Sequence, residues 1–93
     1  SKLILVLGHT SCGAINAAFT GAMPGGNIQS IVDAISPGIA TATTLDEAIE
    51  DNVFAVIETI RTDSPLLRQA EVDGDIDIVG GVYDIATGIV RLL

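Results

Sequence analysis

The sequence predicts an α/β fold: a partial parallel sheet with a helical crossover and a C-terminal β-hairpin. Residues 3–7 form an unbroken apolar run, and residues 76–84 alternate before running apolar into a pair of glycines. Between them lies a long stretch in which the apolar residues recur at helical spacing. Because parallel strands need a long crossover whereas antiparallel neighbours can be joined by a short turn, the first two strands are expected to be parallel.

The N-terminal strand is predicted from Leu-Ile-Leu-Val-Leu at residues 3–7, which ends at a glycine. A continuous apolar run of this kind is typical of a strand that is buried on both faces. A tight turn follows, and either Thr10 or Ser11 is expected to cap a helix over residues 12–18.

The middle of the chain is predicted to be helical. Residues 21–27 contain three glycines and a proline and should form a loop, and a helix should follow over residues 28–35 until Pro37 and Gly38 interrupt it. The strongest helix is expected over residues 45–62, with Thr44 as its N-cap. Its expected apolar stripe is Ile49, Val53, Val56, Ile57 and Ile60.

The last third of the chain predicts a short helix and two strands. Ser64 and Pro65 have the residue types of an N-cap and a first helical position, and this helix should end near Ala70. A strand over residues 76–84, a turn over 86–88 and a returning strand over 89–92 would make the β-hairpin.

The composition indicates one small domain with more apolar surface than it can bury alone. The chain has 93 residues, of which 48% are hydrophobic and only 3% aromatic. Residues 1–93 are therefore interpreted as a single partial domain. The apolar excess predicts that another chain or a missing segment covers part of the surface, so we expect a homo-oligomer or a partner that supplies the rest of the domain.

Charge and cysteine content exclude several classes of function. The chain has 4 basic and 12 acidic residues, a net charge of −8, so neither nucleic acid nor an anionic membrane surface is an expected partner. The longest apolar run is too short to span a bilayer. The single cysteine allows no internal disulfide and suits a reducing compartment, so a cytoplasmic location is expected.

One local pattern carries chemistry. His9 and Cys12 flank the turn at the carboxyl end of the first strand, which is the edge of an α/β sheet where ligands bind. An imidazole nitrogen and a thiolate at this spacing can converge on one zinc ion. By spacing alone, a turn histidine beside a cysteine that packs as a small hydrophobic residue is the favoured explanation of the pattern.

The surrounding sequence resembles the β-class carbonic anhydrases. Residues 4–14, Ile-Leu-Val-Leu-Gly-His-Thr-Ser-Cys-Gly-Ala, resemble the second zinc motif of that family. Residues 78–90, with Tyr83, Asp84 and a Thr-Gly turn, are similar to its last strand and hairpin, and the Ser-Pro-Leu-Leu at 64–67 also fits. The resemblance implies that His9 and Cys12 are zinc ligands supported by Gly8 and Gly13. Tyr83 and Asp84 also match the family, but for them we expect structural roles in the hairpin.

The resemblance also implies a missing part. The family's first motif, Cys-x-Asp-x-Arg, has no counterpart in this sequence, which has no second cysteine. The chain therefore looks like the C-terminal portion of a zinc-dependent enzyme for the reversible hydration of carbon dioxide to bicarbonate, with an incomplete β-carbonic-anhydrase-like fold. Two alternatives stay open: a degenerate, non-catalytic module that acts in assembly, and a hydrolase of a carbon dioxide analogue such as carbon disulfide.

Overall fold

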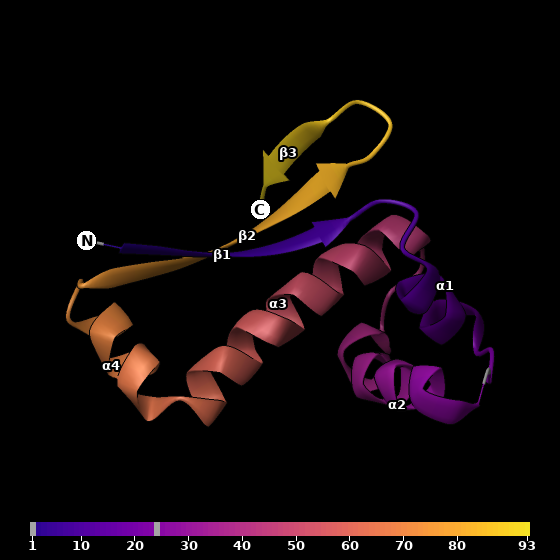
Figure 1. The fold of residues 1–93 in the computed structure, drawn as a ribbon, viewed down its shortest axis with the longest axis horizontal. Helices are drawn as coiled ribbons and strands as arrows, with labels where there is room; N and C mark the ends of the chain where they lie inside the picture. Colours follow the sequence, from indigo (N-terminus) through magenta and orange to yellow (C-terminus); the bar gives the residue numbers. More distant parts are fainter. Residues whose placement is uncertain (1, 24) are drawn as a thin grey trace.

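The computed structural model describes residues 2–23 and 25–93. Three strands and five helical segments follow one another in this part of the chain (Figure 1). In chain order they are β1 (Lys2–His9), α1 (Gly13–Thr20), α2 (Gly26–Ile35), the 3₁₀ turn η1 (Ser36–Ile39), α3 (Leu45–Asp63), α4 (Pro65–Val72), β2 (Ile76–Asp84) and β3 (Ile89–Leu92). None of the described helices is both long enough and apolar enough to cross a bilayer.

The strands form one sheet in the order β1-β2-β3. β1 and β2 are parallel, in a register that runs from Lys2 opposite Ile76 to His9 opposite Tyr83. β3 returns antiparallel to β2, so the predicted parallel pair and C-terminal hairpin are both confirmed. The carboxyl ends of β1 and β2 therefore meet at one edge of the sheet, where the predicted zinc ligands lie.

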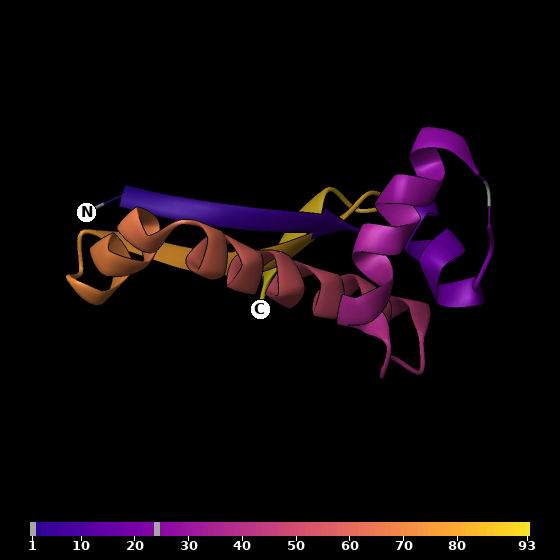
Figure 2. The same ribbon diagram turned by 90° about the horizontal axis from the view of Figure 1, so that it is seen from below.

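Helix α3 runs along one face of the sheet, with α4 at one end and α1 and α2 gathered at the other (Figures 1 and 2). The hydroxyl of Thr44 accepts a hydrogen bond from the Glu47 N–H at 3.1 Å, which confirms the predicted N-cap. Val56, which was expected in the buried stripe, is 39% exposed. The neighbouring Ile57 faces the sheet instead, and successive residues point about 100° apart around a helix axis.

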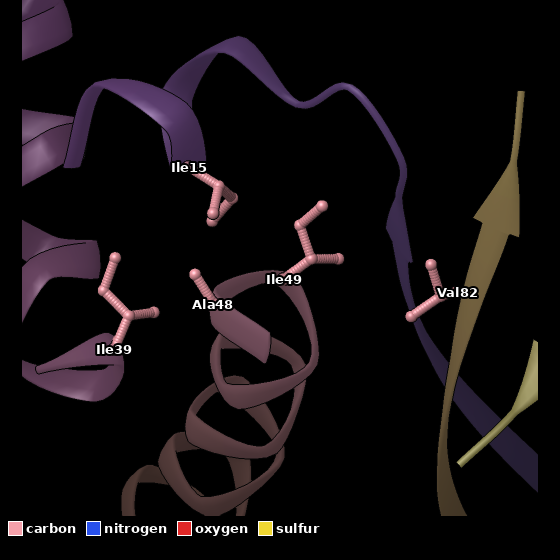
Figure 3. Close-up of a cluster of buried hydrophobic side chains, with 5 residues drawn as sticks. All are labelled: Ile15, Ile39, Ala48, Ile49 and Val82. Carbon is pink, nitrogen blue, oxygen red and sulfur yellow. The ribbon is translucent and has the colours of Figure 1, made fainter. Parts of the chain in front are cut away.

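The core consists of two clusters on the α3 side of the sheet. Near the turn that follows β1, residues from α1, η1, α3 and β2 pack together (Figure 3): Ile15, Ile39, Ala48, Ile49 and Val82. Towards α4, Val53 and Ile57 pack on Ile76 and Ile78, with Ile4 and Val6 alongside. A single helix face thus holds both strands in place.

The prediction that β1 is buried on both faces is wrong for the described residues. Leu3, Leu5 and Leu7 are 64%, 43% and 49% exposed, whereas Ile4 and Val6 pack against the α3 cluster. Side chains alternate across a strand, and the described helices cover only the α3 face. The leucine side chains therefore form an open apolar face.

The predicted cap of α1 is also wrong. Cys12 is the N-cap residue and makes no side-chain capping bond. The Thr10 hydroxyl is already engaged, because it accepts a hydrogen bond from the Ile85 N–H at 3.1 Å. Ser11 adopts a positive φ of 56° within the turn. The predicted loop over 21–27 is shorter than expected, since α2 begins at Gly26.

A two-pronged ion pair joins α3 to α4. Arg61 donates from Nε to Glu71 Oε1 and from Nη2 to Glu71 Oε2, both at 2.8 Å. The hydrogen bond from Arg61 lowers the pKa of Glu71 below 4.5, and the same bond raises the pKa of Arg61. The planar guanidinium binds both carboxylate oxygens and so links the two helices in a defined geometry.

Glu71→Gln is expected to destabilise the fold at neutral pH and to matter less in acid. Because the pKa of Glu71 is lowered by folding, its contribution is present above the unfolded value and is lost as the pH falls through the folded one. Urea denaturation of the wild type and Glu71→Gln from pH 7 to pH 3 measures how far their free energies of unfolding approach each other in acid. Glu58→Gln is the matched control, since Glu58 is 65% exposed and lies 3.5 Å from Arg61. An equal pH dependence in all three proteins would contradict the assignment.

Candidate metal centre

The turn between β1 and α1 is tied to the β2–β3 hairpin. The Thr10 N–H donates to the Tyr83 carbonyl at 2.9 Å, and the Thr10 hydroxyl accepts from the Ile85 N–H. Both bonds come from the carboxyl end of β2, which the parallel register places beside the end of β1. The backbone around His9 and Cys12 is thereby held by a segment more than 70 residues away.

His9 is the last residue of β1 and is exposed. Its Nδ1 lies 2.9 Å from the carbonyl oxygen of Thr10. A carbonyl oxygen can only accept a hydrogen bond, so Nδ1 carries the hydrogen and donates. The neutral ring then has its lone pair on Nε2, and a backbone acceptor on the other nitrogen is the usual support of a metal-binding histidine.

Cys12 lies at the start of α1 with a free thiol. It is half-buried and packs against the cluster that contains Ile15 and Ile49. This contact is what a cysteine acting as a small hydrophobic residue would make. The contact also restricts the side chain of Cys12, and a metal ligand needs such a restriction. Both interpretations of Cys12, as a packed hydrophobic residue and as a metal ligand, therefore fit its surroundings.

The described residues offer two candidate zinc donors, which are too few for a complete site. Their donors, an imidazole and a thiol, are types that zinc prefers. Within residues 2–23 and 25–93, however, no three His, Cys, Asp or Glu side chains gather closely enough to hold a metal ion. A catalytic zinc typically has three protein ligands and one open position. The two donor types therefore fit zinc, but a complete zinc site would need at least one further ligand from other residues.

The two glycines that were expected to support the site, Gly8 and Gly13, differ in how much space surrounds them. A Cβ atom built on Gly8 would lie 2.8 Å from Val53 Cγ2 and 3.3 Å from Ile49 Cγ2, so Gly8 lets α3 approach β1. A Cβ atom on Gly13 would meet nothing within 4 Å. Gly8 is therefore required by packing directly before His9, whereas the described residues place no such demand on Gly13.

Sequence reasoning missed the role of Thr10, which links the turn to the hairpin. No local pattern could have revealed it, because its partners follow β2 and meet it only through the sheet register. Asp84 has the structural role that was expected: its Oδ1 accepts from the Ala86 N–H at 2.9 Å, and its carbonyl accepts from Gly88 at 2.8 Å. Tyr83 contributes its carbonyl to the bond with Thr10.

A pocket of about 340 Å³ lies beside the hairpin on the α3 side. Its lining combines the polar residues Thr10, Asp46, Asp84 and Arg91 with apolar residues that include Ile49 and Val82. Neither His9 nor Cys12 belongs to the described lining. The pocket is therefore separate from the candidate metal ligands, although Thr10 borders both.

Comparison with known proteins decides the family. The sequence profile described as "Carbonic anhydrase" matches residues 1–90. The chain belongs to the carbonic anhydrase family. Carbonic anhydrase 2 of Mycobacterium tuberculosis is 30% identical over 92% of this chain and 46% of its own length. The carbonic anhydrase of Mycolicibacterium smegmatis is 33% identical over 97% of this chain and 48% of its own length. The chain thus spans about half the length of these carbonic anhydrases.

Solved structures place the fold in the β class. A tetrameric β-carbonic anhydrase of Sordaria macrospora superposes with a TM-score of 0.78 at 22% identity, covering 99% of this chain and 52% of that protein. A point mutant of the β-carbonic anhydrase CafD of Aspergillus fumigatus gives 0.67 at 21% identity over 99% and 57%. The predicted membership in the β-class carbonic anhydrases is confirmed, and with it the incomplete β-carbonic-anhydrase fold.

Proposed function

We propose that this chain is the C-terminal portion of a zinc-dependent β-class carbonic anhydrase, which interconverts carbon dioxide and bicarbonate. His9 and Cys12 are the two zinc ligands that this portion supplies. The observation that supports this role most directly is the hydrogen bond from His9 Nδ1 to Thr10 O, which leaves Nε2 as the metal-binding nitrogen. Cys12 follows at the same end of the sheet, as the N-cap residue of α1.

Zinc bound by such ligands supplies the Lewis acidity that lets water ionise near neutral pH. The chain's own residues hold the two proposed ligands, His9 and Cys12, in place. Thr10 fixes the ring of His9 through its carbonyl and anchors the turn through its N–H and hydroxyl. The packing of Cys12 against the core limits where its sulfur can point.

The remaining ligands have to come from residues outside these 93, in the same polypeptide or in a second chain. The exposed leucine face of β1 supports this, because an apolar surface of this kind is normally covered. We therefore expect the 93-residue chain alone to be inactive. Zinc-dependent hydration of carbon dioxide by the purified chain, followed by stopped-flow pH indicator, would refute the need for an added segment.

Cobalt(II) binding tests the two ligands without requiring activity. A thiolate–cobalt bond gives a near-ultraviolet charge-transfer band, which we expect for a longer natural form of the protein and expect to be weaker for its Cys12→Ser variant. His9→Ala should weaken metal affinity by more than about tenfold, since loss of a supporting residue alone costs about 10- to 100-fold. Ser11→Ala, between the ligands, is the control and should bind like the wild type. Equal binding by His9→Ala and Ser11→Ala would remove His9 from the site.

The open face of β1 also favours a second candidate, a non-catalytic module that acts in assembly. Zinc content separates the two. About one zinc per chain in a longer natural form of the protein supports the enzyme, and a content near zero supports the module. Nothing in the described residues favours carbon disulfide over carbon dioxide as the substrate.

A further inference from the structure

One peptide unit, between Asp84 and Ile85, links the β2–β3 hairpin to the turn that carries the candidate metal ligands. Its carbonyl, from Asp84, accepts a hydrogen bond from the Gly88 N–H at 2.8 Å. Its N–H, from Ile85, donates to the Thr10 hydroxyl at 3.1 Å. A peptide unit is planar, so these two groups cannot reorient independently of each other. One end of the unit is therefore held inside the hairpin, and the other end holds Thr10.

The side chain of Asp84 stabilises the hairpin turn that orients this peptide unit. Its Oδ1 accepts a hydrogen bond from the Ala86 N–H at 2.9 Å, which is the local pattern by which aspartate and asparagine stabilise turns. Gly88 completes the turn with a φ of 75°, a conformation that glycine adopts readily. Loss of the Oδ1 atom would leave the Ala86 N–H without this partner, so the peptide unit that follows Asp84 would be held less firmly.

Thr10 connects the hairpin to His9. Besides the bond between its hydroxyl and Ile85, the N–H of Thr10 donates to the Tyr83 carbonyl at 2.9 Å. Thr10 is thus bonded to the residues on both sides of Asp84. The carbonyl of Thr10 in turn accepts a hydrogen bond from His9 Nδ1 at 2.9 Å. The direction of that carbonyl, and with it the orientation of the His9 ring, therefore depends on the hairpin.

We propose that Asp84 is a positioning residue for the His9 ring, which it orients through the Ile85 N–H and Thr10. The inference rests on the proposed function, in which His9 is a zinc ligand. It gives Asp84 an effect at the metal centre in addition to its role within the hairpin. Because Asp84 Oδ1 acts as a hydrogen-bond acceptor in the turn, an amide oxygen in its place should serve equally well.

Nitrogen NMR of the His9 ring tests this link without metal, in a longer natural form of the protein that has been treated with a chelator. The measurement is made at a pH where the ring is neutral, and the His9 signals are assigned by their absence from His9→Gln. We expect the Nδ1–H tautomer in the wild type and in Asp84→Asn, and exchange between the two tautomers in Asp84→Ala.

Thr87→Ala is the matched control within the same turn. The Thr87 hydroxyl accepts a hydrogen bond from the Ile89 N–H at 3.3 Å, so this variant also removes a side-chain acceptor from the hairpin. The lost bond is to Ile89 and not to the peptide unit between Asp84 and Ile85. We therefore expect Thr87→Ala to keep the tautomer of the wild type.

Cobalt(II) affinity of the same proteins gives a second readout. Asp84→Ala should bind cobalt at least about threefold more weakly than the wild type, a smaller effect than the roughly 10- to 100-fold typical of a residue bonded directly to a metal ligand. Thr10→Val removes the hydroxyl that connects Asp84 to His9. In that background Asp84→Ala should weaken binding little further, because both substitutions break the same connection.

Circular dichroism verifies that each variant is folded. If Asp84→Ala is not, Gly88→Ala tests the other end of the peptide unit, because alanine disfavours a φ of 75° and the tautomer should again be lost. The inference is overturned by a wild-type tautomer in Asp84→Ala, by an equal change in Thr87→Ala, or by a loss in Asp84→Asn as large as in Asp84→Ala. It is overturned as well if the two affinity losses multiply in full in the double variant with Thr10→Val.

Failure of the proposed function would look different. In that case the wild type itself would not bind cobalt through His9, and His9→Ala would bind as the wild type does. The tautomer measurement needs no metal, so it would still decide whether Asp84 orients the ring of His9.

Discussion

Ile49→Ala is expected to lower the free energy of unfolding by about 2–5 kcal/mol. Ile49 is 3% exposed and lies in the cluster that joins α1, η1, α3 and β2 (Figure 3). Truncation leaves a cavity at the point where these elements meet. Because a domain of this size has only about 5–15 kcal/mol of stability, the substitution removes a large part of it.

Urea denaturation followed by circular dichroism measures this loss. Phe54→Ala is a matched control on the same helix, because Phe54 is larger but 52% exposed, and its truncation should cost less than about 1 kcal/mol. Equal losses for the two variants would show that the cluster around Ile49 is not the main source of stability at that end of α3.

The second large effect is expected for Gly8→Ala, which should destabilise the fold by about 1–3 kcal/mol. The added Cβ would lie 2.8 Å from Val53 Cγ2, well inside van der Waals contact. Either α3 or β1 has to move, and β1 leads directly into His9. Gly13→Ala is the control: its Cβ meets nothing within 4 Å, and alanine in a helix should be neutral or stabilising by up to about 1 kcal/mol.

A double variant identifies the contact responsible. Val53→Ala removes the methyl groups that the new Cβ would strike, so it should cost less in the Gly8→Ala background than alone. Thermal or urea unfolding of the four proteins gives the coupling, which we expect to exceed about 0.5 kcal/mol for groups in contact. Strict additivity would mean that the strain at Gly8 arises elsewhere.

Several elements could be predicted from local sequence because their causes are local. The apolar spacing and the Thr44 cap predicted a helix over 45–62, and α3 spans Leu45–Asp63. The alternation at 76–84 and the Thr-Gly turn predicted β2 and β3 with the observed bounds. Periodicity, capping and turn residues act over a few positions, so the sequence shows them directly.

The outer face of β1 could not be predicted in the same way. An apolar run shows that a strand can be buried on both faces, but not that anything covers the second face. In the described residues the helices pack on the α3 side, so Leu3, Leu5 and Leu7 remain exposed. Burial is a property of what packs against a segment, and that is decided by the tertiary structure.

For the candidate zinc site, the sequence by itself identified two candidate donors, His9 and Cys12, and the family of the chain, and it contains no second cysteine. Only the tertiary structure decided how the donors are held. It brought Thr10 beside Tyr83 and Ile85, assigned the ring hydrogen of His9 to Nδ1 and showed why residue 8 has to be glycine. The physical reason is that these constraints come from strand register and helix packing, which join residues far apart in the chain.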